Sequence, residues 1–309
     1  MAVTRVLVLR ALGLGDLLVS VPALRGLRAA FPAATITLAA PNGLAELAGL
    51  TGAVDEVLPT SGPGELAWPG PPPSVAVNLH GGGPESTRAL FAARPGRLLT
   101  HAHPEFPAVD GPKWTERVRE ADRWCGLLGY YGIRADPDDL ALARPLGTSP
   151  APGAVVVHPG AGFGACRWPG ERFASVARKL AAGHPVVVTG DDSERDLAES
   201  VAREAGLPGH AVLAGKTGLA ELATLVADAA LVVSGDTGVG HLATAYGTPS
   251  VVLFGPSSPD RWGPPPAPRH RHIVLWSGEE GDPFSAEPHP GLLRITPGEV
   301  VAAANRALG

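Results

Sequence analysis

The feature that most constrains the fold is an alternation of short, apolar, β-branched runs with stretches of helical periodicity, which continues through most of the 309 residues. Continuous apolar runs of this kind are typical of strands in a parallel sheet, and the helices between them supply the crossover connections that parallel strands require. The sequence therefore predicts an α/β protein built from βαβ units.

In the first half, strands are predicted at 5–9, 35–39, 54–58, 75–79 and 97–100. The helix between the first two is expected to start at Pro22, because proline suits a first helical position and disrupts a helix interior. In the second half, predicted strands alternate with predicted helices: strands 154–157, 185–189, 211–213, 230–233 and 250–254, and helices 171–182, 193–205, 219–227 and 238–246. A last helix, opened by a capping box of Thr296 and Glu299 with Pro297 at its first position, runs to Leu308.

The chain is longer than a single hydrophobic core usually organises, so two domains are expected. The stretch 143–154 (ARPLGTSPAPGA) concentrates Pro, Gly and Ser without hydrophobic periodicity, which is typical of a linker. We predict two Rossmann-like domains with parallel sheets, 1–147 and 148–309, whose last helix, 296–309, can return to the first domain. Two such halves would face each other across a cleft, the usual place for a ligand.

Charge and cysteine content narrow the class of protein. The net charge is −5 and the only lysines are Lys113, Lys179 and Lys216, so a nucleic-acid partner is disfavoured. Cys125 and Cys166 lie far apart and outside any metal-ligand spacing, which favours a reducing compartment, and we expect the cytoplasm. Charged residues interrupt the apolar N-terminal run well before the roughly 20 residues of a membrane span, so neither a transmembrane segment nor a signal peptide is expected.

A glycine turn, Gly13-Leu14-Gly15-Asp16, directly follows the first predicted strand. Glycines at this place let backbone N–H groups approach an anion at the carboxyl end of a parallel strand. A dinucleotide fingerprint would need a third glycine near position 18, where Leu18 stands, and an acidic residue at the end of the second strand, so NAD binding is disfavoured. Asp16 is either a helix cap or a catalytic carboxylate.

Two further turns have the same form. After strand 154–157 the chain reads His158-Pro159-Gly160-Ala161-Gly162, which is either a backbone nest for phosphate or an ordinary turn. Arg167, close behind, is either a diphosphate ligand or a solvated surface residue. After strand 230–233 comes Ser234-Gly235-Asp236-Thr237-Gly238-Val239-Gly240-His241, at an expected helix N-terminus that suits phosphate or ribose hydroxyls. The alternative is that Asp236 or Thr237 merely caps that helix, although His241 shares the face of Thr237.

No metal site is predicted. His101 and His103, and likewise His270 and His272, have the spacing that puts two imidazoles on one side of a strand, but neither pair has an evident third ligand.

Together these segments resemble the ADP-heptose:lipopolysaccharide heptosyltransferases, glycosyltransferase family 9, in an ordered set that runs nearly end to end. The matching text is VLRALGLGDLLVSVPALRGLRAAFP, VVVHPGAGFGACRWPGERFA, VVVTGDDSERDLAE and LAGKTGLAELATLVADAALVVSGDTGVGHLATAYGTPSVVLFGPSSPDRWGP. The resemblance implies the GT-B architecture and metal-independent, inverting transfer from an ADP-heptose-like donor to a glycan, glycolipid or small-molecule acceptor. No cofactor is implied beyond that substrate, and peripheral contact with the inner membrane is compatible with it.

The resemblance implies functional roles for residues at the matching positions of this chain. Asp16 is similar to the general base that takes the acceptor's proton. The predicted donor-binding residues are Gly15, Gly160, Ala161, Gly162, Arg167, Glu194, Lys216, Thr217, Asp236, Thr237, Gly238 and His241, with Glu194, Lys216 and Thr217 near the nucleoside.

One departure from the family pattern bears on activity. Cys166 stands two residues before the Trp-Pro pair, where relatives usually carry a phosphate-binding Lys, so Arg167 either takes over that charge or the leaving group is less well stabilised. Two other functions stay open from the sequence: a sugar-nucleotide epimerase of the same architecture, and a non-catalytic nucleotide-sugar binding protein.

Overall fold

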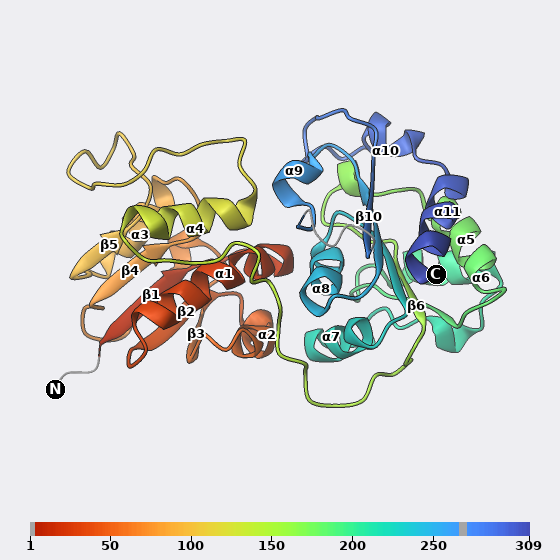
Figure 1. The fold of residues 1–309 in the computed structure, drawn as a ribbon, viewed down its shortest axis with the longest axis horizontal. Coiled ribbons are helices and arrows are strands. Elements are labelled where there is room, and N and C mark those ends of the chain that lie inside the picture. The colour runs from red at the N-terminus through yellow and green to blue at the C-terminus, as the bar shows by residue number, and fades with distance from the viewer. Residues whose placement is uncertain (1–3, 266–270) are drawn as a thin grey trace. The chain divides into compact units, whose positions relative to one another are not determined.

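The structure, a computed structural model, describes residues 4–265 and 271–309. The chain divides into two compact units, Met1–Ala143 and Arg144–Gly309, each an α/β unit around one five-stranded sheet (Figure 1). Every paired strand within the two sheets runs parallel to its neighbours. The predicted fold class, two Rossmann-like units with parallel sheets, is confirmed.

The first unit has the strand order β3-β2-β1-β4-β5, so the chain leaves the central strand β1 on one side and returns on its other side at β4. Helices α1 and α4 pack against each other beside this sheet (Figure 1). The elements are β1 (Arg5–Leu9), α1 (Leu14–Ala30), β2 (Thr35–Ala40), η1 (Asn42–Leu44), α2 (Ala45–Leu50), β3 (Glu56–Pro59), η2 (Pro63–Glu65), β4 (Val75–Asn78), α3 (Glu85–Ala92), β5 (Arg97–Leu99) and α4 (Glu120–Tyr130).

The second unit has the strand order β10-β9-β8-β6-β7, and α5, α6 and α11 pack in one layer on it. Its buried core is aliphatic, with Trp168 and Phe173 edge to face at a ring distance of 5.0 Å. The elements are β6 (Val155–His158), η3 (Gly164–Cys166), α5 (Gly170–Leu180), β7 (Val186–Val188), α6 (Arg195–Ala205), η4 (Gly209–Ala211), α7 (Leu219–Ala227), β8 (Leu231–Gly235), α8 (Gly238–Tyr246), β9 (Ser250–Phe254), α9 (Pro259–Trp262), β10 (His272–Trp276), α10 (Pro290–Arg294) and α11 (Pro297–Leu308).

The last helix forms as its sequence predicts. The Thr296 hydroxyl accepts a hydrogen bond from Glu299 N, and the Glu299 carboxylate accepts one from Thr296 N, which completes the capping box. The helix packs within its own unit, against α5, β8, β9 and β10.

Two predicted elements are wrong. Helix α1 begins at Leu14 rather than at Pro22, which lies in its interior. A helix-interior proline costs about 3 kcal/mol, but each fully buried aliphatic side chain contributes roughly 1.5–3 kcal/mol, and the first turns bury four: Leu17, Leu18, Val19 and Val21. The predicted strand 211–213 is a 3-10 turn, Gly209–Ala211, followed by a single bridge from Val212 to Val188, because the chain lies beside β7 for only one residue.

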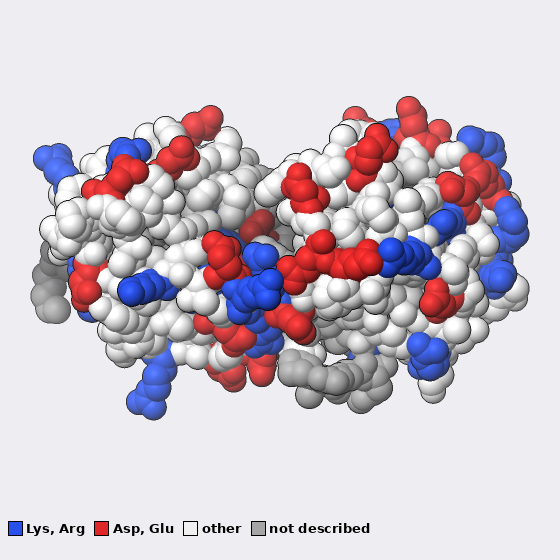
Figure 2. Space-filling view, turned by 90° about the horizontal axis from the view of Figure 1, so that it is seen from above, with Lys and Arg blue, Asp and Glu red and all other residues white. Residues whose placement is uncertain are grey.

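No helix in residues 4–265 or 271–309 is both long enough and apolar enough to cross a membrane. Figure 2 shows one face of the molecule, on which basic and acidic side chains are intermixed rather than gathered into a continuous basic band.

Candidate functional site

Two of the predicted site segments meet at the carboxyl edge of the second sheet. Strands β6 and β8 are neighbours, with His158 in register with Ser234, and the chain continues from them to opposite sides of the sheet, to β7 and to β9. Such a switch point leaves an open crevice between the two strand ends, and open α/β sheets bind ligands there. The turn at Gly160 and the segment that starts at Asp236 therefore lie at the same edge of the sheet.

The turn after β6 brings together four of the predicted donor residues. The Glu194 carboxylate lies against Gly160, so closely that a Cβ at residue 160 would overlap it. Arg167 is exposed, and its Nε donates a hydrogen bond to the Ala161 carbonyl at 3.0 Å, which holds the guanidinium beside the turn. Among the described residues, no hydrogen bond uses the two terminal nitrogens of Arg167, so its fork is available to a ligand.

The same turn offers a matched test of its packing. A Cβ on Gly164 would overlap the main-chain carbonyl of Ala286, which cannot rotate away, whereas a Cβ on Gly162 would have nothing within 4 Å. Gly164→Ala should therefore destabilise the protein by about 1–3 kcal/mol, and Gly162→Ala by much less. Thermal unfolding of the two variants checks this, and equal melting temperatures would contradict the described path of residues 160–166.

Two buried hydroxyls where β8 leads into α8, those of Ser234 and Thr237, have no hydrogen-bond partner among the residues that the structure describes. Helix α8 starts at Gly238 with Thr237 at the cap position, yet the Thr237 side chain makes no capping hydrogen bond. Capping alone therefore does not explain this segment, because unsatisfied buried hydroxyls at a helix N-terminus are costly unless a ligand completes them.

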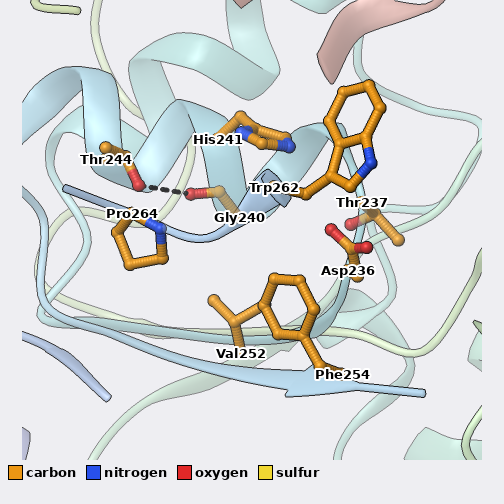
Figure 3. Close-up of a pocket in the computed structure, with 9 residues that line it drawn as sticks. All are labelled: Asp236, Thr237, Gly240, His241, Thr244, Val252, Phe254, Trp262 and Pro264. Atoms are coloured by element: carbon orange, nitrogen blue, oxygen red, sulfur yellow. Dashed lines mark hydrogen bonds between the residues drawn. The ribbon is translucent and has the colours of Figure 1, made fainter. Parts of the chain in front are cut away.

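A narrow cavity opens between α8 and the strand ends. Figure 3 shows Asp236 and Thr237 beside the indole of Trp262, with His241 to the left of the indole. The rings of His241 and Trp262 are 6.4 Å apart. The cavity has a volume of about 10 Å³, room for roughly one water molecule. The recess is therefore too small to enclose a sugar or a nucleotide.

Burial changes the protonation of two groups next to each other. Desolvation raises the pKa of Asp236 to about 7. Burial, and then the neighbouring Asp236, raise the pKa of the Cys166 thiol to about 11. The Cys166 carbonyl lies against the end of β8, 3.1 Å from where a Cβ of Gly235 would be. Position 166, where the resemblance implies a phosphate-binding lysine, thus holds a thiol whose raised pKa favours the neutral form, beside a carboxyl group whose pKa is also raised.

Lys216 lies apart from this group. Its ammonium donates a hydrogen bond to the Val212 carbonyl at 2.8 Å, and its side chain lines a different surface cavity of about 520 Å³, with Glu199 and Arg203 on the wall. Thr217 follows it, just before α7. Contact of these two residues with a nucleoside stays a prediction.

In the first unit, Asp16 is the third residue of α1, and the cap position belongs to Gly13. The cap interpretation of Asp16 is therefore wrong: a longer helix places its carboxylate in the first turn, where the helix dipole favours negative charge. Gly15 precedes it in that turn. The Asp16 side chain is 26% exposed, and its Oδ1 accepts a hydrogen bond from Arg10 Nη2 at 2.9 Å.

Arg10 is a residue that the sequence analysis did not single out. Its side chain is only 2% exposed, and its guanidinium lies 4.8 Å from the ring centre of Trp124. A charged residue directly after an apolar strand, six residues before the candidate base, is the signal that could have identified it. Trp262 had no such signal, because it comes from the short helix α9 rather than from a glycine turn.

No group of three His, Cys, Asp or Glu side chains in residues 4–265 and 271–309 has the arrangement of a metal site. His101 is buried, with its ring 5.0 Å from that of Trp114, and burial lowers its pKa to about 4. His272 lies on β10 with its Nδ1 2.9 Å from the Ser250 hydroxyl, and His270 lies outside the described residues.

Part of the chain is similar to known glycosyltransferases. Residues 137–287 match the family described as glycosyltransferase family 9 (heptosyltransferase). Lipooligosaccharide heptosyltransferase 2 of Haemophilus influenzae is 35% identical over 162 residues, 48% of this chain and 46% of that protein. Lipopolysaccharide heptosyltransferase 2 of Escherichia coli is 31% identical over 159 residues, 48% of this chain and 45% of that protein. The matched stretches thus span about half the length of these relatives.

The likeness in fold extends over the whole chain. The solved structure of E. coli ADP-heptose lps heptosyltransferase II superposes with a TM-score of 0.77 at 22% identity, over 99% of this chain and 98% of that chain. This likeness concerns the fold. The resemblance to the family that the sequence predicted is confirmed by the match of residues 137–287 to the family 9 description and by the heptosyltransferase relatives.

Proposed function

We propose that this chain is a glycosyltransferase that transfers heptose from ADP-heptose to a hydroxyl group of a glycan or glycolipid acceptor, with inversion at the anomeric carbon and without a metal. One observation carries the proposal. The switch point of the second sheet, inside the segment that matches family 9, has a helix N-terminus beside Arg167 and two buried hydroxyls with no partner in residues 4–265 and 271–309. The names of the relatives, which include an ADP-heptose lps heptosyltransferase, supply the donor and point to a lipopolysaccharide acceptor.

In this proposal, Asp16 accepts the proton of the acceptor hydroxyl as its oxygen attacks C1 of the donor sugar. The new C1–O bond forms while the bond from C1 to the diphosphate oxygen breaks, and ADP leaves with that electron pair. Because one carboxylate oxygen of Asp16 is bonded to Arg10, the other is the proton acceptor; no partner of Asp16 Oδ2 is found among the described residues.

The departing diphosphate gains negative charge, which preorganised donors must stabilise. The N-terminus of α8, the Thr237 hydroxyl and the fork of Arg167 are suited to this task. Arg167 thereby replaces the cation that relatives carry at the position of Cys166. Glu194, packed on Gly160 at the neighbouring strand end, is suited to a ribose hydroxyl.

Calorimetric titration with ADP, UDP and GDP tests the donor, and we expect ADP to bind most tightly. Incubation with ADP-heptose and a heptose-free lipopolysaccharide core, followed by mass spectrometry, tests the transfer. A core heavier by one heptose together with free ADP supports the proposal. An isomerised nucleotide sugar from the donor alone would show an epimerase instead, and binding without any turnover of the donor would show a non-catalytic binding protein.

A further inference from the structure

Arg10 joins the two strand ends at the switch point of the first sheet. It follows β1, and its Nη1 donates to the carbonyl of Leu79, the residue that follows β4, at 2.5 Å. Its Nε donates to the main-chain carbonyl of Asp16 at 3.0 Å, and its Nη2 to the Asp16 carboxylate at 2.9 Å. A single guanidinium thus fixes the main chain and the side chain of Asp16 relative to both strands.

The asymmetry of this ion pair argues against a purely structural role. A buried pair that serves only stability is expected to have both partners enclosed, as Arg123 and Glu120 are, with exposed fractions of 2% and 7%. Arg10 is equally buried, at 2%, but Asp16 keeps 26% of its side chain exposed. Desolvation of Arg10 is costly, and it is offset by the hydrogen bonds that all three guanidinium nitrogens donate and by the face of Trp124.

We propose that Arg10 is a positioning residue, which holds Oδ1 of Asp16 so that Oδ2 is presented to the acceptor hydroxyl. The inference rests on the proposed function, in which Asp16 is the base. Arginine is required here because its planar fork reaches three acceptors at once, whereas lysine offers a point charge on a flexible stem. A carboxylate displaced by about 1 Å can lose roughly 100-fold in rate.

The test compares Arg10→Met and Arg10→Lys with Arg123→Met, a matched variant that also removes a buried, ion-paired guanidinium from the first unit. ADP-heptose is the donor, and both water and a heptose-free lipopolysaccharide core are used as acceptors. Arg10→Met should lower kcat roughly 10–100-fold, with the ADP affinity and the KM for ADP-heptose near wild type. Arg10→Lys should fall between Arg10→Met and wild type, and millimolar guanidinium should restore part of the Arg10→Met activity.

Melting temperatures show whether a loss of turnover comes from the positioning of Asp16 or from a loss of folding stability. Arg10→Met and Arg123→Met should lose similar amounts in melting temperature, but Arg123→Met should keep its turnover. Wild-type turnover in Arg10→Met, or an equal loss of turnover in Arg123→Met, would overturn the inference. In crystals of Arg10→Met, α1 should keep its path while the Asp16 carboxylate changes orientation; an unmoved carboxylate would also overturn it.

Asp16→Asn, assayed in parallel, distinguishes this inference from the proposed function. One outcome would refute only the positioning role of Arg10: wild type transfers heptose, Asp16→Asn does not transfer it, and the Arg10 variants transfer it at the full rate. If Asp16→Asn is as active as wild type, or if wild type turns over no donor, the proposed function is wrong, and the crystals of Arg10→Met still show whether Arg10 sets the carboxylate.

Discussion

Asp16→Asn is expected to lower the rate of heptose transfer at least 100-fold, the lower end of what a general base contributes. The amide has nearly the shape of the carboxylate and can still accept the hydrogen bond from Arg10 Nη2, but it cannot take up the acceptor's proton. Because the candidate donor residues at the ends of β6 and β8 are untouched, ADP should bind the variant as it binds wild type. Steady-state turnover of ADP-heptose and calorimetry with ADP measure the two quantities.

Asp139→Asn is the matched control for this experiment. Asp139 also pairs with an arginine of the first unit, Arg25 on α1, so the variant makes the same change of charge at a second ion pair of that helix. It should keep wild-type turnover. A loss in both variants would indicate that the charge or stability of the unit matters rather than proton transfer. Full turnover in Asp16→Asn would exclude Asp16 as the base.

The parts of the fold that follow from local pattern were predictable. Strand β9 and helices α7, α8 and α11 begin and end at the predicted residues, because each is bounded by a glycine, a proline or a capping box that acts over a few residues. The start of α1 was not predictable in this way. Local rules place Pro22 at a helix start, and only the burial of the preceding aliphatic turn against the sheet overrides them.

The candidate site was likewise predictable only where it depends on local pattern. Glycine turns after apolar strands located Ala161 and Asp236 correctly at one sheet edge, because the carboxyl ends of parallel strands lie together. The contact between Glu194 and Gly160 depends on how α6 lies after β7, so residue type gave no indication of it and the resemblance alone suggested Glu194. The cavity beside Trp262 also depends on tertiary packing, since α9 joins the site from beyond β9.

The resemblance implies a lysine where this chain has Cys166, and we infer that the neighbouring Asp236 compensates for the missing charge. With a lysine at that position, an ionised Asp236 would be neutralised; with a thiol whose pKa is about 11, no positive charge is supplied there. Burial then raises the pKa of Asp236 to about 7, so that the carboxyl group becomes neutral on the acid side of neutrality. Cys166 and Asp236 would then both be neutral instead of carrying opposite charges, and in the proposed function Arg167 attracts the diphosphate of the donor.

This arrangement predicts that ADP binding depends on pH through Asp236. Below pH 7 the neutral carboxyl group does not repel the diphosphate, and above pH 7 the carboxylate does. We therefore expect the ADP affinity of wild type, relative to that of Asp236→Asn, to fall about tenfold between pH 6 and pH 8 if the diphosphate binds only the protonated form. The titration of ADP itself is common to both proteins, so the ratio of their affinities isolates Asp236.

The stability of the protein without ligand should also depend on pH through Asp236, and the direction of the change can be predicted. The folded pKa of Asp236 lies above its unfolded value of 3.8, so the folded state binds the proton more tightly, and the free energy of unfolding falls as the pH rises from about 4 to 7 and then levels off. Asp236→Asn lacks this titrating carboxyl group, so at pH 8 it should be more stable than wild type by up to about 4 kcal/mol, but by far less at pH 4.

Thermal unfolding at pH 4, 6 and 8 measures the difference between the two proteins. Asp192→Asn, which removes a carboxylate that is 84% exposed in the same unit, controls for the change of net charge and should show no comparable dependence on pH. If the affinity ratio and the stability difference are both flat across pH 7, Asp236 is ionised throughout. The donor site would then have to overcome its negative charge with Arg167 and the helix N-terminus alone, and the predicted compensation for Cys166 would be wrong.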